Sequence, residues 1–228
     1  MARPIDAERW GAEKRAVADA ARRLAVLGLV TGSSGNVSAR VVPAGNLMAI
    51  TPAGKRYAEL EGGDVVVADF EVETVEDGLP PSSESLLHAA IYVRRPDVEA
   101  VVHTHSTFAT VAAVGGDAIP PLVDEMVIYA GGAIEVSEYA FPGTQELADA
   151  VCDALGPRNA ALIRNHGAVA VGRDLAEAVD LATLVERVAQ VFVFTSLMGK
   201  ADELPSEVVA IEKALFEMRK TASGEAEA

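Results

Sequence analysis

The chain has 228 residues, 50% of them hydrophobic, and a formal net charge of −15. This acidic balance excludes a non-specific nucleic-acid binder, which needs clustered Lys and Arg. It leaves a phosphorylated ligand open, because a local cradle of backbone N–H groups can hold phosphate whatever the global charge.

Length and composition predict a single domain over residues 1–228, and a helical pattern continues in a tail at about 201–228. We find no signal-peptide pattern and no membrane span, and Cys152 is the single cysteine. These features favour a cytoplasmic protein with no membrane partner and no nucleic-acid partner.

In the first third of the chain, apolar spacing predicts a helix at 12–29 that ends near Gly28. A Gly/Ser-rich loop at 31–38 comes next. Short strands are expected at 37–42 and 47–51, joined by a turn that contains Pro43 and Gly45. A turn at 51–54 and a hairpin of strands at 65–69 and 71–75 follow.

The remainder alternates helices with strands. A helix at 84–94, with Ser82 or Ser83 as its N-cap, leads into a buried strand at 98–106. Further elements are then predicted in chain order: a short helix at 108–114, strand and loop at 131–135 and 139–143, a helix at 145–155, strands at 160–163 and 168–171, and helices at 175–198 and 206–219. Residues 221–228 are expected to fray. The class is α/β with a mixed or antiparallel central sheet.

His103 and His105 lie on the β-branched, apolar stretch at 98–106. Side chains alternate along a strand, so the two imidazoles are expected on one face, a few ångströms apart. Two buried polar rings without partners would be costly, which favours metal ligation over simple burial. A catalytic zinc site needs a third protein ligand and keeps one position for water or substrate.

His166 is the candidate for that third ligand. It lies in the tight turn 164–167 between two apolar strands, although its spacing from His105 does not prove that the two meet. His88 shares a helix face with Glu84, four residues earlier. We interpret His88 as a buried or supporting residue rather than a fourth ligand.

Glu84 lies near the first turn of its helix, where two interpretations stay open. A carboxylate there can simply complement the helix dipole. It can also be a metal-adjacent general base whose pKa is tuned by partial burial.

Three loops offer backbone N–H groups and hydroxyls that could converge on a phosphate. Each is an ordinary turn sequence by itself, but together they suggest an anion site. The candidate phosphate residues are Gly35, Asn36, Ala53, Gly54, Ser82 and Ser83.

Six motifs occur in one order: S-G-N-V-S at 34–38, I-T-P-A-G at 50–54, P-S-S-E at 81–84, R-P-D-V at 95–98, V-V-H-T-H-S at 101–106 and N-H-G at 165–167. In this order and spacing the chain resembles the class II aldolase/adducin family over residues 10–200. The resemblance implies an αβα sandwich around a mostly antiparallel sheet, and a homotetramer with active sites at subunit boundaries.

The resemblance further implies one Zn²⁺ per subunit, bound by His103, His105 and His166, with Glu84 as a fourth ligand in the free enzyme and as the acid/base. It implies that the six loop residues hold phosphate. The expected reaction is reversible cleavage of a ketose 1-phosphate into dihydroxyacetone phosphate and an aldehyde, through an enediolate that the metal stabilises. The expected substrate is similar to fuculose 1-phosphate or is a deoxy- or methylthio-pentulose phosphate.

Two positions depart from the fuculose-cleaving members. Ala53 stands where they carry threonine, and Asp124 stands near the tyrosine that supplies a proton on the aldehyde side. Epimerase, dehydratase and decarboxylase activities on the same scaffold remain alternatives, and a non-enzymatic adducin-like domain is disfavoured by the three histidines. The helix at 175–198 is apolar on more than one face at 191–194, so either it is central to the core or one of its faces packs against another subunit.

Overall fold

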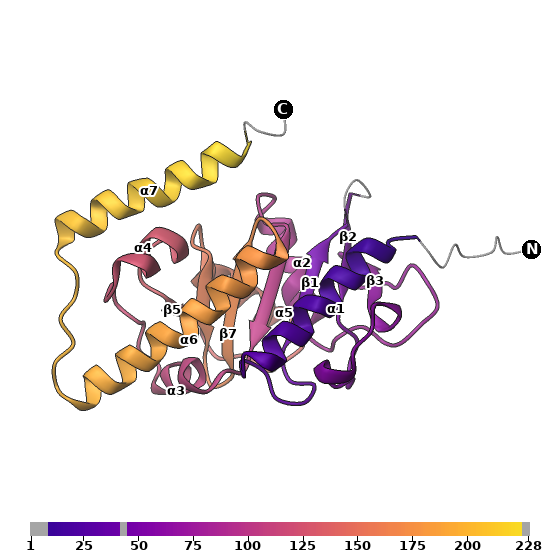
Figure 1. The fold of residues 1–228 in the computed structure, drawn as a ribbon, viewed down its shortest axis with the longest axis horizontal. Coiled ribbons are helices and arrows are strands. Elements are labelled where there is room, and N and C mark those ends of the chain that lie inside the picture. Colours follow the sequence, from indigo (N-terminus) through magenta and orange to yellow (C-terminus); the bar gives the residue numbers. More distant parts are fainter. Residues whose placement is uncertain (1–8, 42–44, 225–228) are drawn as a thin grey trace, which may run out of the picture.

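A seven-stranded sheet organises the part of the chain that the computed structural model describes, residues 9–41 and 45–224 (Figure 1). Its strand order is β3-β2-β1-β4-β7-β6-β5, and every neighbouring pair is antiparallel except β5 with β6. The strands are β1 (Asn36–Arg40), β2 (Leu47–Ile50), β3 (Val66–Asp69), β4 (Ala100–Thr104), β5 (Glu135–Val136), β6 (Ala160–Ile163) and β7 (Gly167–Gly172).

Helices cover both faces of this sheet. The α-helices are α1 (Gly11–Val26), α2 (Ser85–Arg94), α3 (Thr107–Gly115), α4 (Asp124–Ala130), α5 (Gln145–Leu155), α6 (Leu175–Leu197) and α7 (Ser206–Gly224), and short 3₁₀ helices are η1 (Tyr57–Glu59) and η2 (Gly62–Asp64). One hydrophobic cluster joins α1, α3, α4 and α6 to the sheet, and a second joins α2 and α5 to its other face. The predicted αβα sandwich with a mostly antiparallel sheet is confirmed.

β4 is central, and its residues are buried on both faces. Ala100 and Val102 belong to the cluster under α1 and α6, whereas Val101 belongs to the cluster under α2 and α5. The alternation places His103 on the same face as Val101. The last residues of β4 therefore project toward the start of α2.

Several predicted boundaries needed no change, and others were wrong. The helix at 145–155 and the strand at 160–163 have the expected ends. The second hairpin strand at 71–75 is reduced to one isolated bridge between Ala68 and Thr74, because Val72 adopts a left-handed φ of 68° that breaks the extended backbone.

The N-cap of α2 was also misplaced. Glu84, not Ser82 or Ser83, is the N-cap, and the Ser82 hydroxyl instead accepts a hydrogen bond from the Glu84 N–H. The strand predicted at 98–106 ends at Thr104, and the strand predicted at 131–135 is the two-residue β5. Helix α4 was not predicted. Pro43 of the predicted turn lies outside the described residues. So do residues 225–228 of the tail, whose helix extends to Gly224.

Candidate metal centre

His103 is held at the end of β4 by its neighbours on both sides. Its Cα pairs with Asn36 of β1 and with Val169 of β7. The ring Nδ1 donates a hydrogen bond to the Ala168 carbonyl, 2.9 Å away. A backbone carbonyl accepting at Nδ1 leaves the Nε2 lone pair directed at the site, which is the arrangement that metal-binding histidines commonly show.

His166 reaches the same point from the turn between β6 and β7. Asn165 adopts a left-handed φ of 58°, and the His166 N–H donates to the Ile163 carbonyl at 3.0 Å. Gly167 follows because a Cβ there would run into the Thr104 carbonyl. The three imidazole centroids of His103, His105 and His166 lie 4.6–4.8 Å apart, so the histidine that spacing alone could not place does meet the other two.

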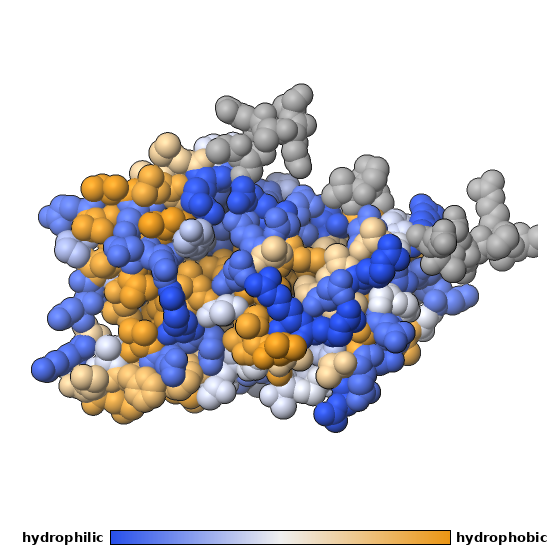
Figure 2. Space-filling model, viewed as in Figure 1, coloured by the Kyte–Doolittle hydropathy of each residue, from blue (hydrophilic) through white to orange (hydrophobic). Residues whose placement is uncertain are grey.

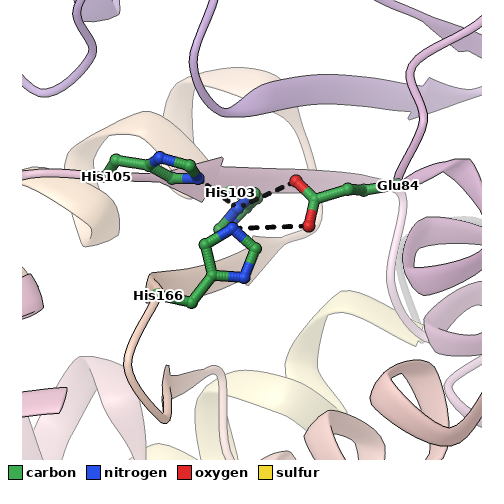
Figure 3. Close-up of side chains that lie close together, drawn as sticks. All are labelled: Glu84, His103, His105 and His166. Carbon is green, nitrogen blue, oxygen red and sulfur yellow. Dashed lines mark hydrogen bonds and ion pairs between the residues drawn. The ribbon is translucent and has the colours of Figure 1, made fainter. Parts of the chain in front are cut away.

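Glu84 faces these rings from the start of α2 (Figure 3). Its Oε2 lies 3.2 Å from His103 Nε2, and its Oε1 lies 3.5 Å from His166 Nε2. The His105 and His103 Nε2 atoms are 3.0 Å apart. We call Glu84, His103, His105 and His166 the histidine–glutamate cluster.

The cluster fits a divalent cation. Its four ligand atoms lie within 4.8 Å of one another, and Glu84 and His103 are buried. The buried Oε1 of Glu84 has no hydrogen bond in the structure, a costly state for a carboxylate that a cation relieves. Three imidazole nitrogens and one carboxylate oxygen are a donor set found in zinc enzymes and in other transition-metal sites. A group that can bind a metal ion is therefore present, and it consists of Glu84, His103, His105 and His166.

The surroundings of His105 and His166 favour the neutral form of both rings. Burial, and then the nearby His103, lower the pKa of His105 to about 4, and the same two causes lower the pKa of His166. Both rings are therefore neutral near pH 7, the form that a metal requires. Burial alone would raise the pKa of Glu84, but its contacts with His103, His166 and Asn36 hold it far below its usual range.

A buried chain of hydrogen bonds supports Glu84 from behind. The Asn36 Nδ2 donates to Glu84 Oε2 at 3.0 Å, and the Asn36 Oδ1 meets His88 Nε2. His88 Nδ1 lies 2.6 Å from the Ser38 hydroxyl, which lies 2.7 Å from the Tyr92 hydroxyl. His88 is thus a supporting residue and not a ligand, as the helix spacing indicated. No local sequence pattern indicated that Asn36, Ser38 and Tyr92 join it.

The candidate phosphate residues gather beside this cluster. The loops around 51–54 and 80–83 run together, with an isolated bridge between Pro52 and Pro81, and the second loop ends at Glu84. Ala53, Gly54 and Ser83 are exposed, and Gly35 and Ser82 are half-buried. The Asn36 carboxamide is engaged by Glu84 and His88, and its backbone pairs with His103 of β4.

Asp124 does not replace the aldehyde-side tyrosine within this subunit's cluster. It opens α4 and faces Glu212 of α7, whose pKa is raised by burial and by the neighbouring Asp124 carboxylate. A hollow of about 520 Å³ lies elsewhere, where β4 begins and β7 ends, among residues such as Arg95, Glu99 and Gly172. That is the edge opposite the histidines, and it carries ion-pairing residues rather than the cluster's metal ligands.

With fold and site in place, comparison with known proteins identifies the family. The sequence model of the Class II Aldolase and Adducin N-terminal domain matches residues 15–193. The chain belongs to this family. It is 39% identical over 189 residues to a 5-methylthioribulose-1-phosphate/5-deoxyribulose-1-phosphate aldolase from Rhodospirillum rubrum. The aligned residues cover 83% of this chain and 84% of the relative.

One further relative and one solved structure bear on the class of reaction. The chain is 38% identical over 188 residues to an L-ribulose-5-phosphate 4-epimerase from Salmonella paratyphi C, with 78% of this chain and 82% of the relative covered. A solved L-fuculose 1-phosphate aldolase matches with a TM-score of 0.85 and 33% identity, covering 90% of this chain and 96% of that one. The predicted family and fold are confirmed, and the aldolase relatives support the predicted class of enzyme, a carbon–carbon lyase.

Proposed function

We propose that this class II aldolase reversibly cleaves a 5-deoxy- or 5-methylthio-pentulose 1-phosphate, or a fuculose-1-phosphate-like ketose, to dihydroxyacetone phosphate and an aldehyde. The observation that carries the proposal is the histidine–glutamate cluster beside the three candidate phosphate loops. The relative from Rhodospirillum rubrum, named for the methylthio and deoxy substrates, supports the pentulose choice. We further propose Zn²⁺ as the metal, because neutral imidazoles with one carboxylate suit it.

His103, His105 and His166 would hold the cation, with Glu84 as a fourth ligand before substrate enters. A divalent cation there supplies a Lewis acid for the oxygens on which charge develops. When the bond between C3 and C4 breaks, the C4 hydroxyl loses a proton and C3 gains one. Glu84, ionised and adjacent to the three rings, is the residue that can carry the proton at C3.

The loops would hold the phosphate of the dihydroxyacetone fragment. The candidate residues are Gly35, Asn36, Ala53, Gly54, Ser82 and Ser83. The N–H groups of Gly54 and Ser83 make none of the backbone hydrogen bonds found in the described part of the chain, so they can serve an anion. Fixing the phosphate there orients the reacting carbons before chemistry begins.

The second candidate is a 4-epimerase, favoured by the relative from Salmonella paratyphi C. Both reactions can break and remake the same bond next to a metal, and they differ in whether the aldehyde leaves. Dehydratase and decarboxylase activities are further alternatives. An adducin-like interaction domain would not need the histidine–glutamate cluster, whose four members are all present.

A substrate panel with the zinc-loaded protein separates these functions. We expect dihydroxyacetone phosphate from 5-deoxyribulose, 5-methylthioribulose or fuculose 1-phosphate, detected with a coupled dehydrogenase. We expect no epimer from ribulose 5-phosphate. Loss of water or carbon dioxide, or epimer formation without release of dihydroxyacetone phosphate, would contradict the aldolase proposal.

The assembly belongs to the proposal as well. We propose a homotetramer with sites near subunit boundaries, formed by one domain over residues 1–228 that works in the cytoplasm. Figure 2 shows apolar side chains between α7 and α6, over α4. On α6, Phe194 is 50% exposed and Leu197 is 80% exposed, more than an isolated subunit needs. None of the helices in the described part of the chain has the length and hydropathy required to cross a bilayer.

A further inference from the structure

The hydrogen-bond chain behind Glu84 is buried along its whole length. Asn36 is 2% exposed, Tyr92 1%, and both Ser38 and His88 0%. Four polar side chains gathered in the core are unusual, because each unpaired polar group there costs free energy. Their contacts satisfy one another and end at the carboxylate of the metal centre.

The chain has one consistent direction. The ionised Glu84 can only accept, so the Asn36 amide nitrogen faces it and the amide oxygen faces His88. His88 Nε2 must then carry the proton, and Nδ1 must accept from the Ser38 hydroxyl. The Ser38 hydroxyl has a single proton and gives it to His88 Nδ1, so the Tyr92 hydroxyl must donate to the Ser38 oxygen.

His88 is the member that sets this direction. Burial, and then the nearby His103, lower the pKa of His88 to about 3, so the ring is neutral and has one donor and one acceptor. A flipped Asn36 amide would place its oxygen against the Glu84 carboxylate, which brings two acceptors together. The His88 N–H prevents that flip by occupying the amide oxygen.

We propose that His88 is a positioning residue for Glu84: through the Asn36 carboxamide, it holds the carboxylate in register with the three histidines. This inference rests on the proposed function only in its effect on catalysis. The carboxylate has to meet the cation in the free enzyme and a carbon atom during the reaction. Supporting partners of this kind typically change metal affinity or activity by about 10–100-fold.

The test compares His88→Phe with His88→Gln and uses Ile91→Val as the control. Phe removes the ring N–H, whereas the Gln amide restores an N–H toward Asn36. Ile91 is a fully buried apolar residue on the same helix, so Ile91→Val loosens packing without touching the chain. We measure the zinc dissociation constant by competition with a chelator, kcat and KM separately, and the His88 tautomer by ¹⁵N NMR of the wild type.

We expect the Nε2–H tautomer in the wild type. In His88→Phe we expect zinc affinity to fall about 10–100-fold and kcat to fall with KM little changed. His88→Gln should recover most of both losses, and Ile91→Val should match the wild type. An Nδ1–H tautomer, unchanged zinc binding in His88→Phe, or equal losses in His88→Phe and Ile91→Val would overturn the inference. The tautomer and the zinc affinities are measured without substrate. If both agree with the expectation but the wild type releases no dihydroxyacetone phosphate, only the proposed function is contradicted.

Discussion

Two glycines set how closely the segments that carry the cluster can approach one another. Gly35 adopts a φ of 80°, and a Cβ there would lie 2.5 Å from the His103 carbonyl oxygen. A Cβ added at Gly167 would come even closer to a backbone atom, the Thr104 carbonyl oxygen. Both contacts are with backbone, which cannot move aside as a flexible side chain could. The short motifs S-G-N and N-H-G therefore contain glycine for the geometry of the metal centre.

Gly167→Ala should weaken the metal centre more than the fold. The added methyl group pushes the turn with His166 away from β4, while the rest of the β7 pairing can persist. We expect reduced zinc affinity and loss of dihydroxyacetone phosphate release, with a circular dichroism spectrum like that of the wild type. Zinc affinity equal to the wild type would show that the turn does not depend on this glycine.

Glu84→Gln separates metal binding from proton transfer. The three imidazoles remain, so we expect one zinc per subunit after zinc loading, bound more weakly than in the wild type because a fourth ligand is lost. The amide cannot carry the proton at carbon, and general acid–base catalysis is typically worth about 10²–10⁴-fold in rate. The cleavage rate and the zinc content of the purified variant check this. A variant that cleaves as fast as the wild type would remove Glu84 from the reaction.

His88 should also make folding stability depend on pH. Its folded pKa of about 3 lies below the unfolded value of about 6.5, so the unfolded chain binds the proton more readily. The contribution of His88 is fully present above pH 6.5 and is lost as the pH falls toward 3, by up to about 1.4 kcal/mol per unit. Urea unfolding at pH 7, 6 and 5 should show a steeper loss for the wild type than for His88→Gln. Parallel curves would contradict this account.

The members of the histidine–glutamate cluster could be picked out from the sequence, but the hydrogen-bond chain that supports Glu84 could not. Strand alternation was sufficient to pair His103 with His105, because both lie on one short segment. The hydrogen-bond chain joins residues about fifty positions apart, such as Asn36 with His88 and Ser38 with Tyr92. Their meeting depends on the register between β1 and β4 and on where α2 begins, and neither is encoded in a local pattern.

At the scale of the elements, amphipathic segments with clear ends were predictable and short ones were not. α5 has Thr144 as an N-cap whose hydroxyl accepts from the Leu147 N–H, and Gly156 follows its end. α4 has seven residues, too few to show a helical period. Its only local signals are an acidic first turn and the left-handed Gly131 after it.

The docking of α7 is testable through Phe216. This ring is 3% exposed and lies so close to Gly131 that a Cβ there would meet it at 2.8 Å. Phe216→Ala removes that contact between α7 and α4, and core Phe→Ala changes cost about 3–5 kcal/mol when the surroundings cannot collapse. We expect faster hydrogen exchange in α7 while β4 and β7 stay protected. Uniform exchange changes across the chain would show that α7 is part of one cooperative unit.

For the whole molecule, exposed apolar residues on α6 lead to a test of assembly. Phe194 also contacts Phe108 of α3, with ring centroids 5.6 Å apart. We expect light scattering to give the mass of four subunits for the wild type. Leu197→Asp places a charge at an 80% exposed position, so it should dissociate the assembly without unfolding the subunit. A wild-type monomer would contradict the proposed tetramer.

The most direct test of the central claim is a zinc titration of the metal-stripped wild type, followed by dihydroxyacetone phosphate release from the substrate that the panel identifies. We expect no release before zinc is added. The rate should then rise linearly and stop rising at one equivalent per subunit, because one histidine–glutamate cluster holds one cation. Full activity in the stripped protein, or a rate that zinc and other divalent cations fail to restore, would contradict the account.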